Sequence, residues 1–214
     1  MNAHRAVLAA TLRHRLVACA LGVLVTAQGG CATSPPSRYY QLHSALRPTA
    51  RDEATSPDVL LVGVGPVHVP DYLDRPQIVT LSGSRIDVAE FDRWAGSVEK
   101  DVARVLVEDL AALLPAERFF VTRWSAHPPS PSCRVEVRVE RFEGPLQGPV
   151  LLRAQWLVFA PDGRLLRGRS SSISEEVTGE GYVALVGAMS AALERLSRAI
   201  AEDVAPLAPA RAAR

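Results

Sequence analysis

The sequence predicts an α/β protein, a compact sandwich in which a mixed and mostly antiparallel sheet packs against two main amphipathic helices. Three observations lead to this class. Apolar, β-branched runs of strand length recur along the chain, and two longer segments, 97–114 and 181–204, carry apolar residues at helical spacing. The order is strands, helix, several strands, helix, and we find no internal repeat. We therefore expect one domain with one core.

The first half of the chain holds strand and loop signals in close succession. We predict a strand at 39–43, an exposed loop at 44–57, a buried strand at 58–70, and extended segments at 77–81 and 85–91. The tripeptide Ser-Gly-Ser at 82–84 has turn composition and separates the last two segments. We interpret residues 58–91 as a pair or trio of antiparallel strands.

The clearest helix lies at 97–114. Ser97 suits the N-cap position, while Glu99 and Asp101 suit the positive end of the helix dipole. Trp94, just before the helix, is expected to plug the core beneath it. The apolar face that should pack on the sheet contains Val98, Val102, Val105, Leu106, Leu110 and Leu113.

Further strands follow this helix. We predict them at 118–124, 133–142 and 150–160, with another beginning at Leu165. Residues 133–142 alternate apolar and charged side chains, which is typical of a half-buried antiparallel strand with a solvated, charge-paired face. The sequence Pro-Asp-Gly-Arg predicts a tight hairpin turn, in which Gly163 supplies a positive φ.

The last predicted element is the second amphipathic helix, at 181–204. Pro206 should end it, and residues 207–214 are expected to form a disordered tail. Gly187 should cost this helix about 1 kcal/mol unless close packing needs it. Its apolar face contains Leu185, Met189, Leu193, Leu196 and Ile200.

An export signal occupies residues 1–30. Basic residues without any acid precede an uncharged run of 12 residues, Leu16 to Ala27. A membrane span needs roughly 20 apolar residues, so we expect this segment to be removed. The sequence Gly-Gly-Cys ending at Cys31 fits the core of a bacterial lipobox, although Gln28 stands where an aliphatic residue is usual. Acylation at Cys19 and ordinary signal cleavage are the two alternatives.

Cleavage before Cys31 divides the chain into a lipidated N-terminus with a spacer, residues 31–38, and a domain at 39–206. A single acyl chain holds a protein only marginally, but a lipoprotein cysteine carries several, which gives stable membrane anchoring. The next residue is Ala32 and not Asp. This choice resembles enterobacterial lipoproteins that are sorted to the outer membrane, so we expect an anchor on its periplasmic face.

Charge and cysteine content narrow the classes of function. Without the signal, the chain carries 21 basic against 23 acidic side chains, and this lack of basic excess argues against nucleic acid as a partner. Cys133 is then the one cysteine left unblocked. With no partner in the chain, it is interpreted as a small buried residue and not as part of a disulfide.

Residues 62–114 carry a family resemblance. The block Val-Pro-Asp-Tyr-Leu-Asp-Arg-Pro-Gln-Ile-Val at 69–79, the Phe-Asp-Arg-Trp-Ala step at 91–95 and the helix after it resemble the PqiC (YmbA-like) family of lipoproteins, auxiliary components of ABC-type transport. The lipobox followed by Ser-Pro-Pro-Ser-Arg-Tyr-Tyr-Gln-Leu also matches the start of the family. The resemblance covers nearly all of the chain after the signal.

The resemblance implies a partner role. Family members resemble outer-membrane-anchored periplasmic subunits that work with MCE-domain proteins in moving lipids between two membranes, which supports envelope integrity. It implies a compact α/β sandwich, and it brings no catalytic residues to this chain. The site that it places is the lipid attachment at Cys31. A homo-oligomer is compatible with this role.

The loop at 70–76 is a candidate interface. Pro70 and Pro76 stiffen it, and Tyr72, Leu73 and Arg75 are residue types that anchor protein interfaces. The alternative is a rigid turn with Tyr72 folded back on the core.

Enzyme and metal motifs are missing from the sequence. Gly63 and Gly65 lack the third glycine of a dinucleotide site, and there is no Walker A, Gly-x-Ser-x-Gly or His-Glu-x-x-His sequence. We therefore expect no enzyme, no cofactor and no metal. The histidines beyond the signal are isolated in sequence, at His43, His68 and His127. The acidic residues that could suggest a cation match no Ca²⁺ loop and are interpreted as solvated: Asp71, Asp74, Asp87, Glu90 and Asp92.

Two other functions remain open at this point. A monomeric carrier that binds a lipid itself would need an apolar cavity of several hundred Å³ between sheet and helices. A lipoprotein regulator of an envelope enzyme would have a similar small α/β domain.

Overall fold

The structure, a computed structural model, describes residues 34–46, 59–125 and 130–208. Those from Ser37 onward belong to one structural unit. Its elements in chain order are β1 (Arg38–Tyr40), β2 (Leu60–His68), β3 (Gln77–Ser82), β4 (Arg85–Trp94), α2 (Val98–Leu113), β5 (Phe119–Arg123), β6 (Cys133–Glu143), β7 (Pro149–Phe159), β8 (Leu165–Glu176), α3 (Gly181–Val204) and the short 3₁₀ helix η1 (Ala205–Leu207).

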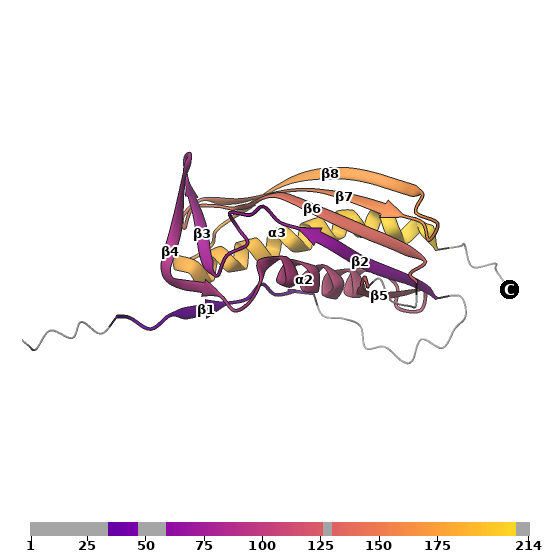
Figure 1. Ribbon diagram of the computed structural model, residues 1–214, viewed down its shortest axis with the longest axis horizontal. Helices are drawn as coiled ribbons and strands as arrows, with labels where there is room; N and C mark the ends of the chain where they lie inside the picture. The colour runs from indigo at the N-terminus through magenta and orange to yellow at the C-terminus, as the bar shows by residue number, and fades with distance from the viewer. Residues whose placement is uncertain (1–33, 47–58, 126–129, 209–214) are drawn as a thin grey trace, which may run out of the picture. The chain divides into compact units, whose positions relative to one another are not determined.

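The described strands form two sheets (Figure 1). The three-stranded sheet has the order β1-β4-β3, and the five-stranded sheet has the order β5-β2-β6-β7-β8. Parallel pairing joins β1 to β4 and joins β2 to both β5 and β6, while the remaining pairs are antiparallel. The predicted α/β class, with mixed strand pairing and two main helices, is confirmed.

The interpretation of residues 58–91 as one antiparallel group is wrong for its first strand. β3 and β4 do form an antiparallel hairpin, but β2 lies in the other sheet and runs parallel to both neighbours. The side chains of Val62, Val64 and Val67 are buried, and no charged residue lies within this strand. Such continuous apolar runs are typical of central parallel strands, which need a crossover connection to their neighbour. Here the path from β2 to β5 passes through the hairpin and α2.

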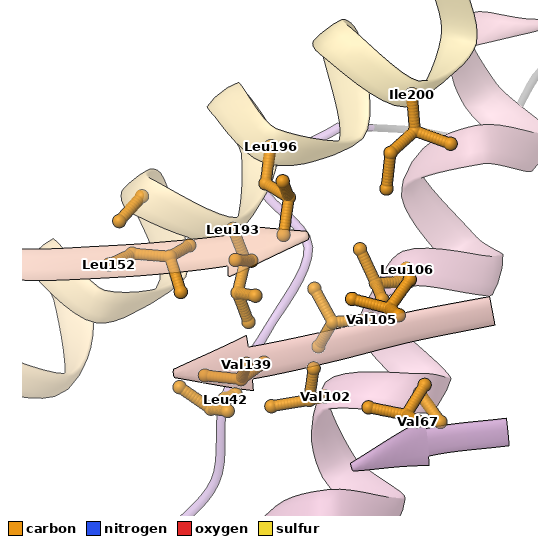
Figure 2. Packing of buried hydrophobic residues seen from close by; sticks show 14 of the residues in the cluster. Leu42, Val67, Val102, Val105, Leu106, Val139, Leu152, Leu193, Leu196 and Ile200 are labelled. Carbon is orange, nitrogen blue, oxygen red and sulfur yellow. The ribbon is translucent and has the colours of Figure 1, made fainter. Parts of the chain in front are cut away.

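The core lies between the five-stranded sheet and the two helices. α2 packs against β2 and β5, α3 packs against β7 and β8, and the helices contact each other. Figure 2 shows Leu193, Leu196 and Ile200 of α3 pointing toward Val105 and Leu106 of α2. No helix within the described ranges is long and apolar enough to cross a membrane.

Both predicted apolar helix faces are confirmed, and Ser97 caps α2 by accepting a hydrogen bond from the Lys100 amide at 3.5 Å. Trp94 is 6% exposed and fills the core as expected. The exception on the apolar side of α2 is Asp109, which is fully buried. One of its carboxylate oxygens accepts a hydrogen bond from Ser197 of α3 at 2.9 Å, and burial raises the pKa of this carboxyl.

Smaller predictions for β6 and β7 also hold. The inward valines of β6 are buried, and the outward Arg134 and Glu136 form an ion pair at 2.7 Å. Cys133 is buried and free, and burial raises the pKa of its thiol to about 11. Gly163, in the turn between β7 and β8, has a φ of 83°.

The predicted tail begins too early. Pro206 lies in η1, which redirects the chain so that Leu207 packs on the core and Ala208 is buried. The Ala208 carbonyl also accepts a hydrogen bond from Arg118 at 2.9 Å. The fold therefore extends through Ala208. Residues 209–214 and most of the predicted loop at 44–57 lie outside the described residues.

Two glycines should respond in opposite directions to alanine. A Cβ at Gly187 would meet nothing within 4 Å, so Gly187→Ala should raise the free energy of unfolding by about 0.5–1 kcal/mol through helix propensity. A Cβ at Gly144 would approach the Pro149 carbonyl oxygen at 2.7 Å and the Val150 Cα at 2.8 Å, so Gly144→Ala should lower it by about 1–3 kcal/mol. Urea unfolding measures both. A destabilised Gly187→Ala variant would show that this position has a packing role.

Candidate functional site: the docking of the N-terminal segment

The chain enters the fold through a short strand at the edge of the three-stranded sheet. β1 runs parallel to β4, with Tyr39 opposite Arg93, and the Tyr40 carbonyl accepts a hydrogen bond from the Ala95 amide at 2.8 Å. A strand of three residues has few backbone bonds of its own. Side-chain contacts must therefore supply most of its attachment.

Asp92 of β4 is the main attachment point for β1. Its side chain accepts hydrogen bonds from Arg38 at 2.8 Å and from the Tyr40 hydroxyl at 2.6 Å, and the residue is 4% exposed. Burial alone would raise the pKa of Asp92, but the two hydrogen bonds and the Arg38 charge outweigh it, so the pKa is lowered. The ionised carboxylate therefore stabilises the docked strand.

The residues after β1 continue into the gap between the two helices. The Leu42 side chain is 1% exposed and belongs to the core, where Figure 2 shows it in the same cluster as Val102 and Val139. The His43 amide donates a hydrogen bond to the Ser190 hydroxyl of α3 at 3.2 Å. Leu42 thus acts as an apolar plug that fixes the segment to the helical layer.

The first turns of α2 hold the backbone of the same segment. The Leu42 amide donates a hydrogen bond to Asp101 at 2.7 Å, and the Leu42 carbonyl accepts one from Arg104. Arg104 is itself paired with Asp101 and, at 2.9 Å, with Glu108. Both backbone groups of Leu42 are therefore satisfied by charged side chains of one helix. We call Arg38, Tyr40, Leu42 and their partners the N-terminal docking site.

The loop at 70–76 is held by backbone hydrogen bonds at both of its prolines. The Leu73 amide donates a hydrogen bond to the Pro70 carbonyl at 2.9 Å, and the Trp94 amide donates one to the Pro76 carbonyl at 2.7 Å. The Tyr72 hydroxyl donates to Glu143, which is 2% exposed, at 2.5 Å. Burial and this hydrogen bond raise the pKa of Tyr72.

The three interface candidates in this loop differ in their surroundings. Leu73 is 5% exposed and Tyr72 is half-buried against the core, which matches the alternative of a rigid turn with Tyr72 folded back. Arg75 is exposed. Of the three, only the arginine is fully presented to a partner.

The remaining candidate residues are separated or lie elsewhere. Cys31, Cys19 and His127 lie outside the described residues. His68 is exposed, and His43 lies with its ring Nδ1 3.3 Å from the Ser190 hydroxyl. Within the ranges that the structure describes, no three His, Cys, Asp or Glu side chains are placed to hold a metal ion.

Sequence reasoning missed the docking site itself. It treated Asp92 as solvated and Asp101 as a helix-end charge, whereas both bind the N-terminal segment. The partners Arg38 and Asp92 are 54 residues apart, so no local pattern joins them.

A family model described as the ABC-type transport auxiliary lipoprotein component matches residues 40–201. The chain belongs to this family. The match begins at Tyr40, within the docking site, and ends near the C-terminus of α3. This confirms the resemblance to PqiC/YmbA-like proteins and makes the chain a transport-associated lipoprotein.

Two solved structures are similar in fold. A crystal structure of an uncharacterized protein is 24% identical with a TM-score of 0.64, and the match covers 79% of this chain and 99% of that one. A crystal structure of a Xanthomonas campestris protein is 15% identical with a TM-score of 0.62, covering 79% and 95% of the two chains. No curated protein matches the sequence significantly.

The Asp92 attachment should make stability depend on pH. The pKa of Asp92 is lowered in the folded state, so its contribution is present above the unfolded value of about 3.9 and is lost as the pH falls through the lower folded value. Asp92→Asn should lower the free energy of unfolding at pH 7 by about 1–3 kcal/mol and flatten its fall in acid.

Asp87→Asn is the matched control for this experiment. Asp87 also pairs with an arginine, Arg85, at 2.8 Å, but its side chain is 41% exposed. This exposed pair should be worth at most about 1 kcal/mol. Equal effects of the two substitutions across the pH range would contradict the role given to Asp92.

Proposed function

We propose that the protein is a non-enzymatic lipoprotein subunit, anchored by acylated Cys31 in the outer membrane and facing the periplasm, of an MCE-type intermembrane lipid transport system. In this account residues 1–30 are removed, residues 31–38 carry the lipid and the spacer, and the folded domain binds a periplasmic MCE-domain protein. Family membership as a transport auxiliary lipoprotein supports the transport role.

The observation that carries the proposal is the N-terminal docking site. Arg38 follows Cys31 by seven residues, and an extended chain of that length spans at most about 25 Å. Because β1 and Leu42 are bonded into the fold, the linker between the acyl chains and the domain is limited to these seven residues. Such a short connection keeps the domain near the membrane surface, where it can position a partner protein.

The packing of the core argues against the alternative of a lipid carrier. A cavity of several hundred Å³ between the helices and the five-stranded sheet would leave accessible surface on the side chains that line it. The side chains that meet there have 0% exposure; they include Leu106, Leu152, Leu193, Leu196 and Ile200. Among the described residues, this layer is therefore filled by the protein's own side chains.

Two exposed features suit a protein partner. Arg75 stands on the loop between Pro70 and Pro76, and arginine is enriched at the energetic centres of interfaces. β8 lies at an edge of the five-stranded sheet, where the described chain pairs it only with β7, and most of its side chains are exposed. An exposed strand edge can accept a strand from another protein.

Lipid attachment is tested by metabolic labelling with a fatty-acid analogue. The native chain and Cys19→Ala should be labelled and should fractionate with the outer membrane, while Cys31→Ala should lose the label because it lacks the acylated thiol. If the label persists in Cys31→Ala and disappears in Cys19→Ala, the acylated cysteine is Cys19 and not Cys31. If both variants keep the label, neither cysteine is the acylation site and the proposed lipid anchor is wrong.

Partner binding is tested by capture from detergent-solubilised envelope. Recovery of an MCE-domain protein is the expected result, whereas recovery of a cell-wall synthase would support the regulator alternative instead. Arg75→Asp tests the loop as the contact surface, and Arg167→Asp tests the β8 edge. The control is Arg123→Asp, on β5 at the opposite edge of the five-stranded sheet. One of the first two should reduce recovery about tenfold or more. Equal recovery with all three would show that neither feature contacts the partner.

A further inference from the structure

We propose that Arg93 binds the phosphate group of a membrane phospholipid, so that one face of the three-stranded sheet is turned toward the bilayer. The inference rests on the proposed lipid anchor and deepens it, because it adds a headgroup site and an orientation of the domain. Within the Phe-Asp-Arg-Trp-Ala step at 91–95, Asp92 attaches β1 and Trp94 fills the core. Neither role accounts for Arg93, which lies between them.

Strand pairing determines the face on which the Arg93 side chain lies. Arg93 is paired with Tyr39 of β1 and with Gln77 of β3, so these three residues share one face of the sheet. Tyr40 is on the other face, where its ring lies 6.2 Å from the ring of Tyr182 in α3. We call the face that carries Tyr39, Gln77 and Arg93 the outer face.

The Arg93 guanidinium is buried at one nitrogen and accessible at the other two. Its Nε atom is buried and has no hydrogen-bond partner. The two terminal Nη nitrogens are not buried, and within the described chain they form neither a hydrogen bond nor an ion pair. Burial of Nε restricts the side chain, which lowers the entropy cost of binding a ligand at the Nη groups.

A second arginine shows how such a charge is compensated inside the protein. Arg134 also has a buried Nε without a partner, but it pairs with Glu136 at 2.7 Å and lies over the rings of Trp124 and Phe159. No comparable group compensates Arg93 in the part of the chain that the structure describes. A guanidinium that is partly buried and lacks a counterion is a site for an anion.

The carboxylates nearest to Arg93 in the sequence do not neutralise it. Asp92 is turned to the other face, where it accepts hydrogen bonds from Arg38 and Tyr40. Glu90 is exposed and forms no ion pair within the described ranges. The missing partner is therefore an external anion. A phosphate fits, because the planar guanidinium can donate to two of its oxygens at once.

Apolar side chains on the same face favour a lipid phosphate. The register shift adds residues to β4 and none to β3, so Val79 and Leu81 share the outer face with Gln77, and so do their partners Val88 and Ile86. Ile86 is 44% exposed and Val88 is 42% exposed. The outer face thus presents a cation and, about 7 Å further along the sheet, apolar groups. This composition suits the boundary between headgroups and acyl chains.

The tether brings the outer face within reach of the bilayer. Tyr39 follows Cys31 by eight residues, which span at most about 29 Å. Arg93 lies one strand further, and neighbouring strands are about 5 Å apart. With Cys31 acylated, Arg93 therefore stays close to a high local concentration of lipid phosphate. One arginine can be occupied under these conditions, because binding within an anchored molecule is effectively intramolecular.

The test is residue-resolved modification of the lipidated full chain by phenylglyoxal, a reagent for arginine. The protein is anchored in phosphatidylcholine vesicles or in vesicles of a galactosyl diacylglycerol, which has the same acyl chains and no phosphate. Mass spectrometry follows the modification of each arginine. Arg138 of β6 is the matched control in the same sample, since it is exposed, forms no ion pair among the described residues and belongs to the other sheet.

Arg93 should be modified about tenfold or more slowly in phosphatidylcholine than in the galactolipid, because charge-assisted hydrogen bonds to phosphate occupy its Nη groups. Arg138 should react at the same rate in both. Equal rates for Arg93 in the two lipids would overturn the proposal. Protection of Arg93 that requires added envelope protein would also overturn it, since an acidic group of a protein partner would then be the ligand.

Glycerophosphocholine added to the galactolipid vesicles identifies the source of the phosphate. It supplies the same phosphate diester without acyl chains, so it should protect Arg93 less than the phosphatidylcholine bilayer does. Equal protection would make this a site for a soluble phosphate diester and would overturn the orientation toward the membrane.

Fatty-acid labelling of the same samples separates this inference from the proposed function. A protein that carries no acyl label refutes the anchor itself. A labelled protein in which Arg93 reacts equally in both lipids keeps the anchor and refutes the headgroup site.

Discussion

The hydrogen bonds and ion pair between Asp92 and the first strand are the interaction on which the rest of the account depends. A strand of three residues at a sheet edge is held weakly by its backbone alone. The buried carboxylate, with Arg38 and Tyr40 as donors, makes that strand part of the fold. Since a buried carboxylate without partners is costly, the same group also disfavours release of the segment. The segment from Arg38 to Tyr40 is thereby fixed to the domain.

The helical layer also attaches the N-terminal segment to the fold, through apolar packing and through hydrogen bonds to its backbone. Leu42 fills an apolar position between the helices, while Asp101 and Arg104 satisfy its backbone amide and carbonyl. The close packing between helices and sheet leaves the described domain without a lipid-sized chamber there. A domain of this kind can position other molecules through its surface, which agrees with its membership in a family of transport auxiliary lipoproteins.

Much of the fold could be predicted from the sequence, because the apolar pattern of a long helix or strand extends over many residues and does not depend on any single one. Both helices, the hairpin turn at Gly163 and the alternation of 133–142 were found in this way. Strand pairing was not predictable to the same degree. The central position of β2 depends on a crossover through α2 and on pairing with strands far along the chain, and local composition carries only a weak signal for that.

The candidate site was harder to predict than the fold. The lipid attachment at Cys31 follows from a local motif, and it remains a prediction because it lies outside the described residues. The docking site joins Arg38 to Asp92 and Leu42 to Asp101, pairs that are 54 and 59 residues apart. Conversely, Tyr72 was a candidate for an interface by residue type alone, and its hydroxyl is committed to buried Glu143. Residue type indicates what a side chain can do, whereas burial decides whether a partner can reach it.

Hydrogen exchange of the Leu42 and His43 amides in the membrane-anchored protein is the most direct test of the central claim. These amides donate to Asp101 and to Ser190. If the segment is part of the fold, both should be protected to a similar degree as amides in the middle of α2, and Asp92→Asn should reduce their protection selectively. Exchange at the rate of an unstructured peptide would show that the segment is a free linker, and the account of a rigidly held, membrane-proximal domain would be wrong.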